Sequence, residues 1–392
     1  MRPEHELLLR CAQACMNSEG AERIRALASR DIHWNYLIRT SLSHSVMPLL
    51  YRTLSTMCPE AVPEATMHEL RSHFYTNAYR NLLLTRELLR LLNLFEASLI
   101  PVVPLRGPTL SECVYGDLSL RQFGDLDILI RKQDSARVNE LMISHGYTPL
   151  HELSPKLKAA YEKHRCHCAF VQGDDGPMVE IHWLITPGYF SAPLDFQRMC
   201  ERLVLTSLGG KDVSVLSPED LLLTLCMHGS KHCWERLGWI RDVAKLISLH
   251  REMRWQYAIS EASKLRSERM LFLGLLLAND LLKVYLPNEV LKKVQADRVV
   301  RTLAIQVRDR LFRNDSNRSV IFQPFLFQLR MQAGLMDRIR YCVGYGSVLM
   351  TPTVLERRLI ALPDSFLPLY YIVRPIRLMV KHGLRLARRP GR

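Results

Sequence analysis

Apolar residues recur at three- and four-residue spacing through the N-terminal part of the chain, and this is the period of an amphipathic helix. The clearest run places eight leucines between positions 82 and 94. Pro59 and Pro63 interrupt the pattern, because proline removes a helix donor and restricts the residue before it. We therefore expect three to five helices between residue 6 and about residue 97.

The pattern changes after Ser98, where short apolar runs alternate with turn residues. Leu99 to Leu105 is short and rich in β-branched residues, as expected for a buried strand. A Gly-Asp-Asp-Gly turn at 173–176 predicts a hairpin between two further strands. The mixture indicates an α+β fold for this part of the chain. The predicted elements are a strand at 99–105, a short helix at Thr109–Val114, a strand at Asp125–Ile130, a helix from about Asp134 to Ser144, and strands at 166–172 and 178–185.

Helical spacing returns after residue 217. Ser217 is a typical N-cap, and Pro218 suits the first helical position. The helical pattern continues to a basic tail at the end of the chain. We therefore predict four parts, which are a helical N-terminal region (1–95), an α+β domain (96–210), a helical C-terminal domain (211–365) and a basic tail (366–392).

Composition is that of a folded protein, with 48% hydrophobic and 23% charged residues among 392, and this excludes an intrinsically disordered chain. The formal net charge of +14 favours anionic partners such as nucleotide phosphates, nucleic acid or an acidic membrane surface. Seven basic and no acidic residues lie between Val373 and Arg392. This tail suits peripheral contact with an anionic membrane or nucleic acid, or a partly disordered extension.

The cellular location is predicted from cysteine usage and apolar runs. Ten cysteines are scattered through the chain, and no apolar leader follows Met1. No run of 18 or more apolar residues predicts a membrane span. Because this combination is typical of a reducing compartment, we predict a cytoplasmic protein, with peripheral membrane association through the tail as an alternative.

Two carboxylates begin the predicted strand at 125–130. Asp125 and Asp127 point to the same face, because strand side chains alternate with a period of two. Such a pair requires a counter-ion, and Mg²⁺ is a hard cation that takes oxygen ligands and bridging phosphates. Glu180 lies on a neighbouring predicted strand, with Val179 and Ile181 facing away into a core. We predict Asp125, Asp127 and Glu180 as catalytic ligands of a two-metal site, with a general base or an exposed structural residue as the alternatives for Glu180.

Basic residues near these carboxylates predict where a triphosphate binds. Arg106 and Gly107 close a strand and open a helix, whose backbone amides and positive end suit phosphate. Arg121 is a second candidate for charge-assisted contacts with phosphate oxygens. We therefore predict these three residues as nucleotide-binding.

A later predicted helix carries His228 and His232 four residues apart, so that they share a face. This spacing also suits a helical zinc pair, but no glutamate follows His228 as the metalloprotease pattern requires. We predict instead that this face lines the nucleotide cleft, with Lys231, Trp234 and Arg236 either contacting phosphate and base or lying on the surface.

The segment Cys166-His167-Cys168 contains three residue types that bind metals. In a strand the two cysteines face one way and the histidine faces the other, so one ion cannot easily take all three. No Cys-x-x-Cys partner lies nearby. The pattern therefore predicts buried, inert thiols.

Several motifs follow one another along the chain. They are Arg106-Gly107, Leu120–Leu129 (Leu-Arg-Gln-Phe-Gly-Asp-Leu-Asp-Ile-Leu), Val179–Trp183, Ser217–Leu223, Cys226–His232 and Trp239–Ala244. Together they resemble the uncharacterised bacterial nucleotidyltransferase family of the DNA polymerase β-like superfamily. The resemblance implies a minimal nucleotidyltransferase fold, a small mixed sheet with helices, flanked here by helical regions. It also implies a nucleoside triphosphate substrate and metal ligands at Asp125, Asp127 and Glu180. The chain departs from the superfamily at Pro108, which removes an amide donor from the phosphate loop.

These observations predict an Mg²⁺-dependent nucleotidyltransferase that moves a nucleoside monophosphate, AMP from ATP, onto a hydroxyl or phosphate of a small molecule or peptide. Two alternatives stay open. One is a catalytically weak nucleotide-binding or scaffolding module in a biosynthetic pathway. The other is an RNA-modifying nucleotidyltransferase, which the net charge suits. Neither the acceptor nor the oligomeric state follows from the sequence.

Overall fold

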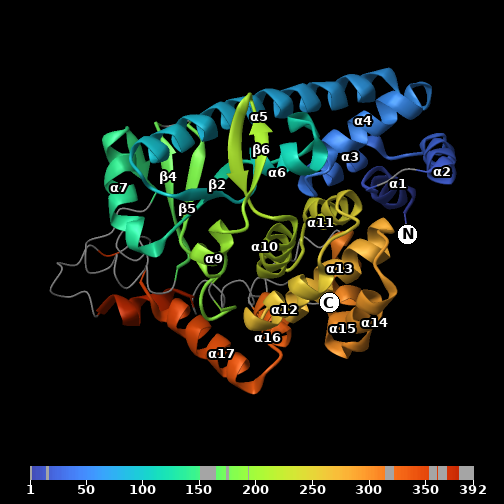
Figure 1. Ribbon diagram of the computed structural model, residues 1–392. Helices are drawn as coiled ribbons and strands as arrows, with labels where there is room; N and C mark the ends of the chain where they lie inside the picture. The colour runs from blue at the N-terminus through green and yellow to red at the C-terminus, as the bar shows by residue number, and fades with distance from the viewer. Residues whose placement is uncertain are drawn as a thin grey trace.

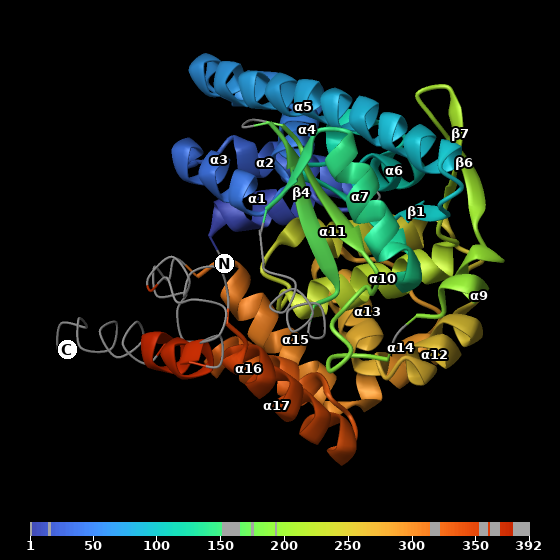
Figure 2. The same cartoon turned by 90° about the vertical axis from the view of Figure 1, so that its left-hand side faces the viewer.

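Helices make up most of the described chain and surround a small mixed sheet (Figure 1). The computed structural model describes residues 2–14, 17–150, 165–173, 176–192, 194–313, 322–352, 360 and 369–378. Two views at 90° place helix α5 (Glu64–Ala97) along one side of the molecule and helix α17 (Leu335–Met350) along the opposite side (Figure 2). The predicted α+β class with flanking helical regions is confirmed.

Five helices precede the sheet, as the apolar spacing predicts. A single 3₁₀ turn at Pro59–Ala61 interrupts them, and α5 begins directly after Pro63. Since proline cannot donate to the preceding turn, the chain breaks where the two prolines stand. The four helices before this break are α1 (Pro3–Cys11), α2 (Ser18–Ala28), α3 (Trp34–Ser43) and α4 (Met47–Met57).

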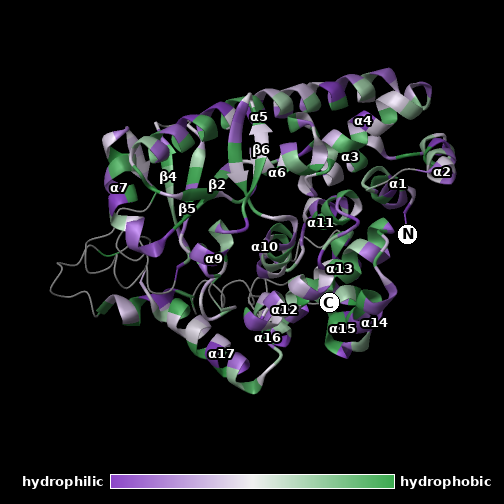
Figure 3. Cartoon of the chain, viewed as in Figure 1, coloured by the Kyte–Doolittle hydropathy of each residue, from purple (hydrophilic) through white to green (hydrophobic). Residues whose placement is uncertain are grey.

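Helix α5 is the longest described helix, with 34 residues and a length of about 50 Å. Along it, polar and apolar residues alternate (Figure 3). Leu84, Leu88, Leu91 and Phe95 are buried against the sheet, so the helix covers one sheet face. The boundary predicted between residues 95 and 96 falls in the last turn of this helix and stays a prediction.

Five strands form the central sheet in the order β1-β2-β5-β4-β3. Strands β2 and β5 are parallel, with Asp127 opposite Glu180 in the register, and the other neighbouring pairs are antiparallel. Pro104 lies in the edge strand β1, where a missing donor is tolerated. The bounds are β1 (Val102–Pro104), β2 (Asp125–Ile130), β3 (Tyr147–Pro149), β4 (His167–Gln172) and β5 (Met178–His182).

The two faces of the sheet differ in chemistry. On one face, Leu126, Ile128, Val179 and Ile181 are almost fully buried and form a core with α5 and α7 (Ser135–Ser144). Since strand side chains alternate, the carboxylates of β2 and β5 point to the opposite face. The hydrophobic pattern therefore assigns the apolar face to packing and leaves the polar face for chemistry.

The remaining helices form a second, larger core together with the N-terminal helices. The two parts are joined by backbone contacts such as Gly238 N donating to His44 O at 2.9 Å. No described helix is both long and apolar enough to cross a membrane. The helices that follow the central sheet in the chain are α9 (Phe196–Cys200), α10 (Pro218–Lys231), α11 (Leu237–Leu249), α12 (Trp255–Lys264), α13 (Glu268–Leu282), α14 (Asn288–Ala296), α15 (Arg298–Leu311), α16 (Phe322–Met331) and α17.

Several predicted element bounds need correction. The strand predicted at 99–105 is only three residues long, and the strand predicted at 178–185 ends at His182, where the chain turns away from the sheet. The hairpin β6 (Val204–Leu208) and β7 (Lys211–Val215), a separate two-stranded sheet, was not predicted. Of the predicted basic tail (366–392), residues 366–368 and 379–392 lie outside the described residues, and the predicted boundaries at 210 and 365 stay predictions.

Candidate metal and nucleotide site

The polar face of the sheet brings carboxylates from β2 and β5 together. Asp127 and Glu180 are direct register partners across the parallel pair, and Asp125 lies two residues before Asp127 on the same face. A ligand atom from each of Asp127, Glu180 and His182 lies within 4.8 Å of the others. The parallel pairing of β2 with β5 is therefore what gathers the three predicted carboxylates.

Asp127 is the centre of a buried charge network. Its Oδ1 lies 2.8 Å from Arg106 Nη2 and 2.9 Å from His182 Nε2. His182 Nε2 also lies 3.2 Å from Glu180 Oε2. Asp127 and His182 are only 4% and 3% exposed, whereas Glu180 is 20% exposed, so Glu180 is the most accessible member of this network.

The two aspartates differ electrostatically. Burial and the neighbouring Asp127 raise the pKa of Asp125. Burial also opposes ionisation of Asp127, but Arg106 and His182 outweigh it and hold the pKa of Asp127 well below its usual range. The pKa of Glu180 is lowered despite its burial, because His182 and His167 lie beside it. The site therefore holds two stabilised carboxylates and one, Asp125, that lacks a sufficient counter-charge.

This arrangement fits a divalent cation. Within the described residues, the carboxylate of Asp125 makes no hydrogen bond or ion pair, although it is half-buried beside two other carboxylates. Carboxylate oxygens are the ligands that Mg²⁺ and Mn²⁺ prefer. A cation between β2 and β5 would supply the charge that Asp125 lacks.

The Arg106-Gly107 turn lies directly beside this cluster. Gly107 has φ +67° and ψ −127°, a conformation that side-chain-bearing residues rarely adopt. A Cβ added at this position would lie 3.5 Å from Asp125 O. The helix predicted after Gly107, at Thr109–Val114, is shorter in the structure. Only Pro108–Leu110 (α6) is α-helical before the chain widens into a π-helix at Ser111–Tyr115, so no strong helix dipole is expected to grip phosphate.

Replacing Gly107 with alanine is expected to destabilise the fold by about 1–3 kcal/mol, because a Cβ is strained at this backbone conformation. Urea unfolding of the two proteins measures the difference. Gly146→Ala is a matched control, since Gly146 (φ +81°) also has a positive φ but lies at the end of α7, away from the carboxylates. Only Gly107→Ala should also weaken nucleotide binding, and an equal loss in both variants would contradict a role for this turn.

Arg121 has a partner that the sequence did not reveal. Its Nε donates to both carboxylate oxygens of Asp242 at 3.1 Å, and Tyr115 OH donates to Asp242 Oδ1 at 2.7 Å. The guanidinium is 11% exposed and also lies over the Phe123 ring. Its charge reaches Asp125, but its main contact joins the segment before β2 to α11. A structural role therefore accounts for most of its contacts, and its role in phosphate binding stays a prediction.

The predicted helix face is α10, and it lies beside the polar face of the sheet (Figure 1). The rings of His228 and His232 are 4.7 Å apart, and both lie about 5 Å from the Trp239 ring. Burial and Arg106 hold the pKa of His228 well below its usual range, and burial, with Lys231, lowers the pKa of His232 to about 4. Both imidazoles are therefore neutral at neutral pH.

Trp234, which was predicted to lie on this helix face or on the surface, does neither. Trp234 is fully buried in the core and packs against Gly229 and Gly274, so it neither contacts a base nor lies on the surface. Lys231 is half-buried, and its Nζ lies 3.9 Å from Cys166 Sγ. The histidines and Lys231 thus remain candidates for the nucleotide cleft.

The thiol of Cys166 is buried, as predicted, but it lies among cationic side chains that the prediction of an inert thiol did not include. This residue precedes β4 rather than lying within it, so strand alternation does not separate it from His167. Cys166 Sγ lies 3.4 Å from His167 Nδ1. Although burial opposes ionisation, His167, His182 and Lys231 lower the pKa of Cys166 to about 5.

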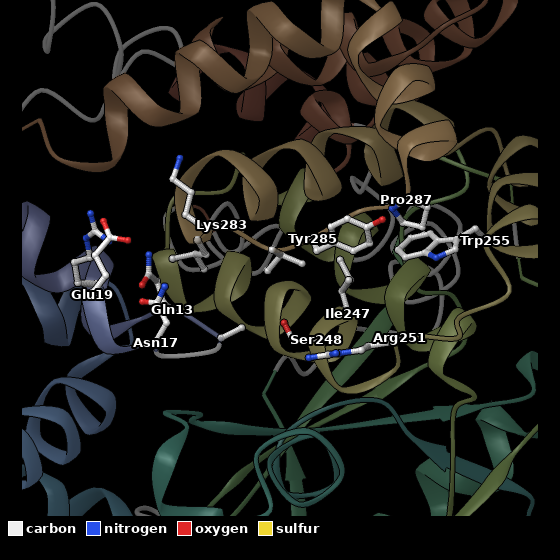
Figure 4. A pocket seen from close by; sticks show the side chains of 14 residues that line it. Gln13, Asn17, Glu19, Ile247, Ser248, Arg251, Trp255, Lys283, Tyr285 and Pro287 are labelled. Carbon is white, nitrogen blue, oxygen red and sulfur yellow. The ribbon is translucent and has the colours of Figure 1, made fainter. Parts of the chain in front are cut away.

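Of the hollows lined by described residues, two bear on the predicted site residues. One, of about 640 Å³, lies between the N-terminal helices and α11 to α13, with Gln13, Trp255 and Tyr285 on its walls (Figure 4). Within the described chain, none of the predicted site residues lines it. The other, of about 400 Å³, adjoins β2 and is lined by residues that include Arg80, Gly124 and Arg236.

Of the comparisons with known proteins, the one with family models assigns the chain to a family. A family model described as an uncharacterised nucleotidyltransferase matches residues 30–283. No curated protein matches the chain. The crystal structure of an antigenic nucleotidyltransferase-like protein from Paracoccidioides brasiliensis is 14% identical, covers 49% of this chain and 87% of its own, and has a TM-score of 0.28. A structural likeness this weak supports no conclusion.

Proposed function

Because the chain belongs to the uncharacterised nucleotidyltransferase family, it is a transferase with a nucleotide substrate, and we propose that it transfers AMP from ATP in an Mg²⁺-dependent reaction. The acceptor in this proposal is a hydroxyl or phosphate of a small molecule or peptide. The observation that carries the proposal is the convergence of Asp125, Asp127 and Glu180 on the polar face of the sheet. Within the described structure, Arg106 and Arg121 do not offset the burial of Asp125 and the charge of Asp127, so the pKa of Asp125 is raised.

The three carboxylates would hold the metal. Mg²⁺ bound there would neutralise the triphosphate charge and stabilise the entering and leaving oxygens. His182 Nε2 lies 2.9 Å from Asp127 Oδ1, and this contact orients the carboxylate. Arg106, 2.8 Å from Asp127, lies beside any phosphate bound over that carboxylate and would orient it.

Glu180 is the residue best placed to take a proton. It is ionised at neutral pH because its pKa is lowered, and it is the most exposed member of the charge network. As the acceptor oxygen attacks the α-phosphorus, the bond to pyrophosphate breaks and the acceptor proton passes to Glu180. Two neutral imidazoles, His228 and His232, lie with Trp239 in a cluster of tilted rings nearby, and one of these rings could stack on the nucleotide base.

The hollow beside Gly124 suits an anionic acceptor. It adjoins the start of β2, and Arg80 and Arg236 are its two arginines. Arg80 Nη2 donates to Gly124 O at 3.3 Å, which places one guanidinium next to the strand that carries Asp125. We propose that acceptors bearing a phosphate or carboxylate bind in this hollow.

The proposal is tested with the purified chain, each of the four α-labelled nucleoside triphosphates, and fractions of a small-molecule extract, with and without Mg²⁺. Label transferred to an acceptor from ATP, only with Mg²⁺ present, is the expected result. Tight ATP binding without transfer to any fraction would instead favour a nucleotide-binding module. Transfer to RNA alone would favour the RNA-modifying alternative.

A further inference from the structure

A second group of metal-binding side chains lies next to the carboxylates. One ligand atom from each of Cys166, His167 and His182 lies within 4.8 Å of the other two. His167 and His182 are register partners on β4 and β5, and the centroids of their rings are 4.8 Å apart. The thiol and His182 are 2% and 3% exposed, so the group is enclosed by protein.

The two imidazoles are oriented in the same way. His182 Nε2 faces Asp127 and Glu180, and His167 Nε2 lies 3.7 Å from Glu180 Oε2. Their Nδ1 atoms are therefore left for another partner. His167 Nδ1 lies 3.4 Å from Cys166 Sγ, and His182 Nδ1 is buried with no hydrogen-bond partner in the described structure.

Histidines that bind zinc commonly donate their second ring nitrogen to a carboxylate, which fixes the tautomer and leaves a lone pair for the metal. His182 meets that condition with Asp127 at 2.9 Å, and His167 Nε2 faces Glu180 at 3.7 Å, which is an ion-pair distance. A bound cation would also satisfy the orphan nitrogen of His182, and an unsatisfied buried polar atom is costly.

We propose that Cys166 Sγ and the Nδ1 atoms of His167 and His182 bind a transition-metal ion, with Zn²⁺ as the ion that this donor set fits best. One thiolate and two imidazoles are borderline-soft ligands, which favour Zn²⁺ over Mg²⁺. Three protein ligands leave the fourth tetrahedral position open. Carboxylates lie next to two of the three ligands, since Asp127 and Glu180 both face the Nε2 atom of His182 and Glu180 also faces that of His167.

This site and the proposed Mg²⁺ site have different ligands, but they are neighbours and two carboxylates take part in both. Asp127 and Glu180 are outer partners of the Zn²⁺ ligands and proposed ligands of Mg²⁺. Occupancy of the thiol site would hold His182 in one tautomer, with its Nε2 proton donated to Asp127. The inference does not depend on nucleotidyl transfer, because its test reads metal binding directly.

The test uses Co²⁺ as a spectroscopic substitute for Zn²⁺ on the full chain after chelator treatment. One Co²⁺ per chain with a thiolate-to-cobalt charge-transfer band, displaced by Zn²⁺ but not by excess Mg²⁺, is the expected result. Cys166→Ser should abolish the band. Cys168→Ser is the matched control and should keep it, because Cys168 Sγ instead contacts Ile181 O on the neighbouring strand.

Two further variants keep the inference testable if Cys166→Ser folds poorly. His167→Gln should remove the charge-transfer band or weaken Co²⁺ binding at least about tenfold, since it removes one of three ligands. Glu180→Gln should keep the band but weaken Co²⁺ binding by about 10–100-fold, because it removes only an outer partner. A spectrum with no thiolate band, or a band that survives in folded Cys166→Ser, would overturn the proposal.

Discussion

Asp125→Asn is expected to lower Mg²⁺-dependent transfer of labelled nucleotide by about a thousandfold. The substitution keeps the shape of the side chain and removes one metal-ligating charge. Metal ions supply several kcal/mol of transition-state stabilisation, and about 4 kcal/mol corresponds to a factor of about 10³ in rate. The rate of label transfer at saturating ATP measures the effect.

The same substitution is expected to leave stability unchanged or to raise it. Asp125 has a raised pKa, so its ionised form is disfavoured in the folded state, and neutral asparagine removes that penalty. The gain should be present at pH 7 and should disappear as the pH falls below the ordinary aspartate pKa of about 3.9, where the wild-type carboxyl is protonated in both states. Urea unfolding at several pH values measures it.

Asp127→Asn is the matched comparison for this prediction. Its carboxylate pairs with Arg106 and His182, and its pKa is well below the usual range. Its stabilising contribution is therefore present above the ordinary aspartate pKa and is lost as the pH falls through the folded value. Both variants should lose transfer, but only Asp127→Asn should lose stability at pH 7. Full activity in Asp125→Asn, or equal destabilisation in the two, would contradict these roles.

Asp242→Ala is expected to destabilise the fold by about 3–5 kcal/mol, because it leaves the buried Arg121 guanidinium without its counter-charge. Asp242 is 3% exposed and also accepts the Tyr115 hydroxyl. The substitution therefore breaks three contacts that hold α11 to the segment before β2. Urea unfolding, followed by circular dichroism, measures the loss.

Two controls separate this effect from a general loss of charge. Glu96→Ala removes an exposed partner of Lys211 and should change stability little, since solvent-exposed pairs contribute little. The double variant Arg121→Met/Asp242→Leu should recover much of the lost stability, because it removes both buried charges together. Similar unfolding curves for Asp242→Ala and Glu96→Ala would show that the Arg121 pair does not stabilise the fold.

Strand periodicity alone correctly places Asp125 and Asp127 on one face of β2, with Val179 and Ile181 on the core side of β5. The closeness of Glu180 to Asp127 depends on the parallel pairing of β2 with β5, and no local pattern specifies which strands become neighbours. The same limit explains Arg121, whose partner Asp242 is 121 residues away in the chain.

Local irregularity explains what the pattern did not predict around residue 166, namely the contact of Cys166 with an imidazole. The alternation rule assumes that the strand has already begun, but β4 starts at His167, so Cys166 is free to turn toward the neighbouring imidazoles. Trp234 shows a similar limit. Its left-handed backbone (φ +53°) directs the indole into the core beside Gly229 and Gly274, which helical spacing could not foresee.

The central claim is that Asp125, Asp127 and Glu180 hold a divalent cation that nucleotide binding requires. Equilibrium dialysis of labelled ATP, with and without Mg²⁺, tests it directly on the wild-type chain and on a folded Asp125→Asn/Asp127→Asn double variant. We predict tight ATP binding only for the wild-type chain with Mg²⁺ present. Equal ATP binding by the double variant, or wild-type binding that does not change when Mg²⁺ is removed, would contradict the claim.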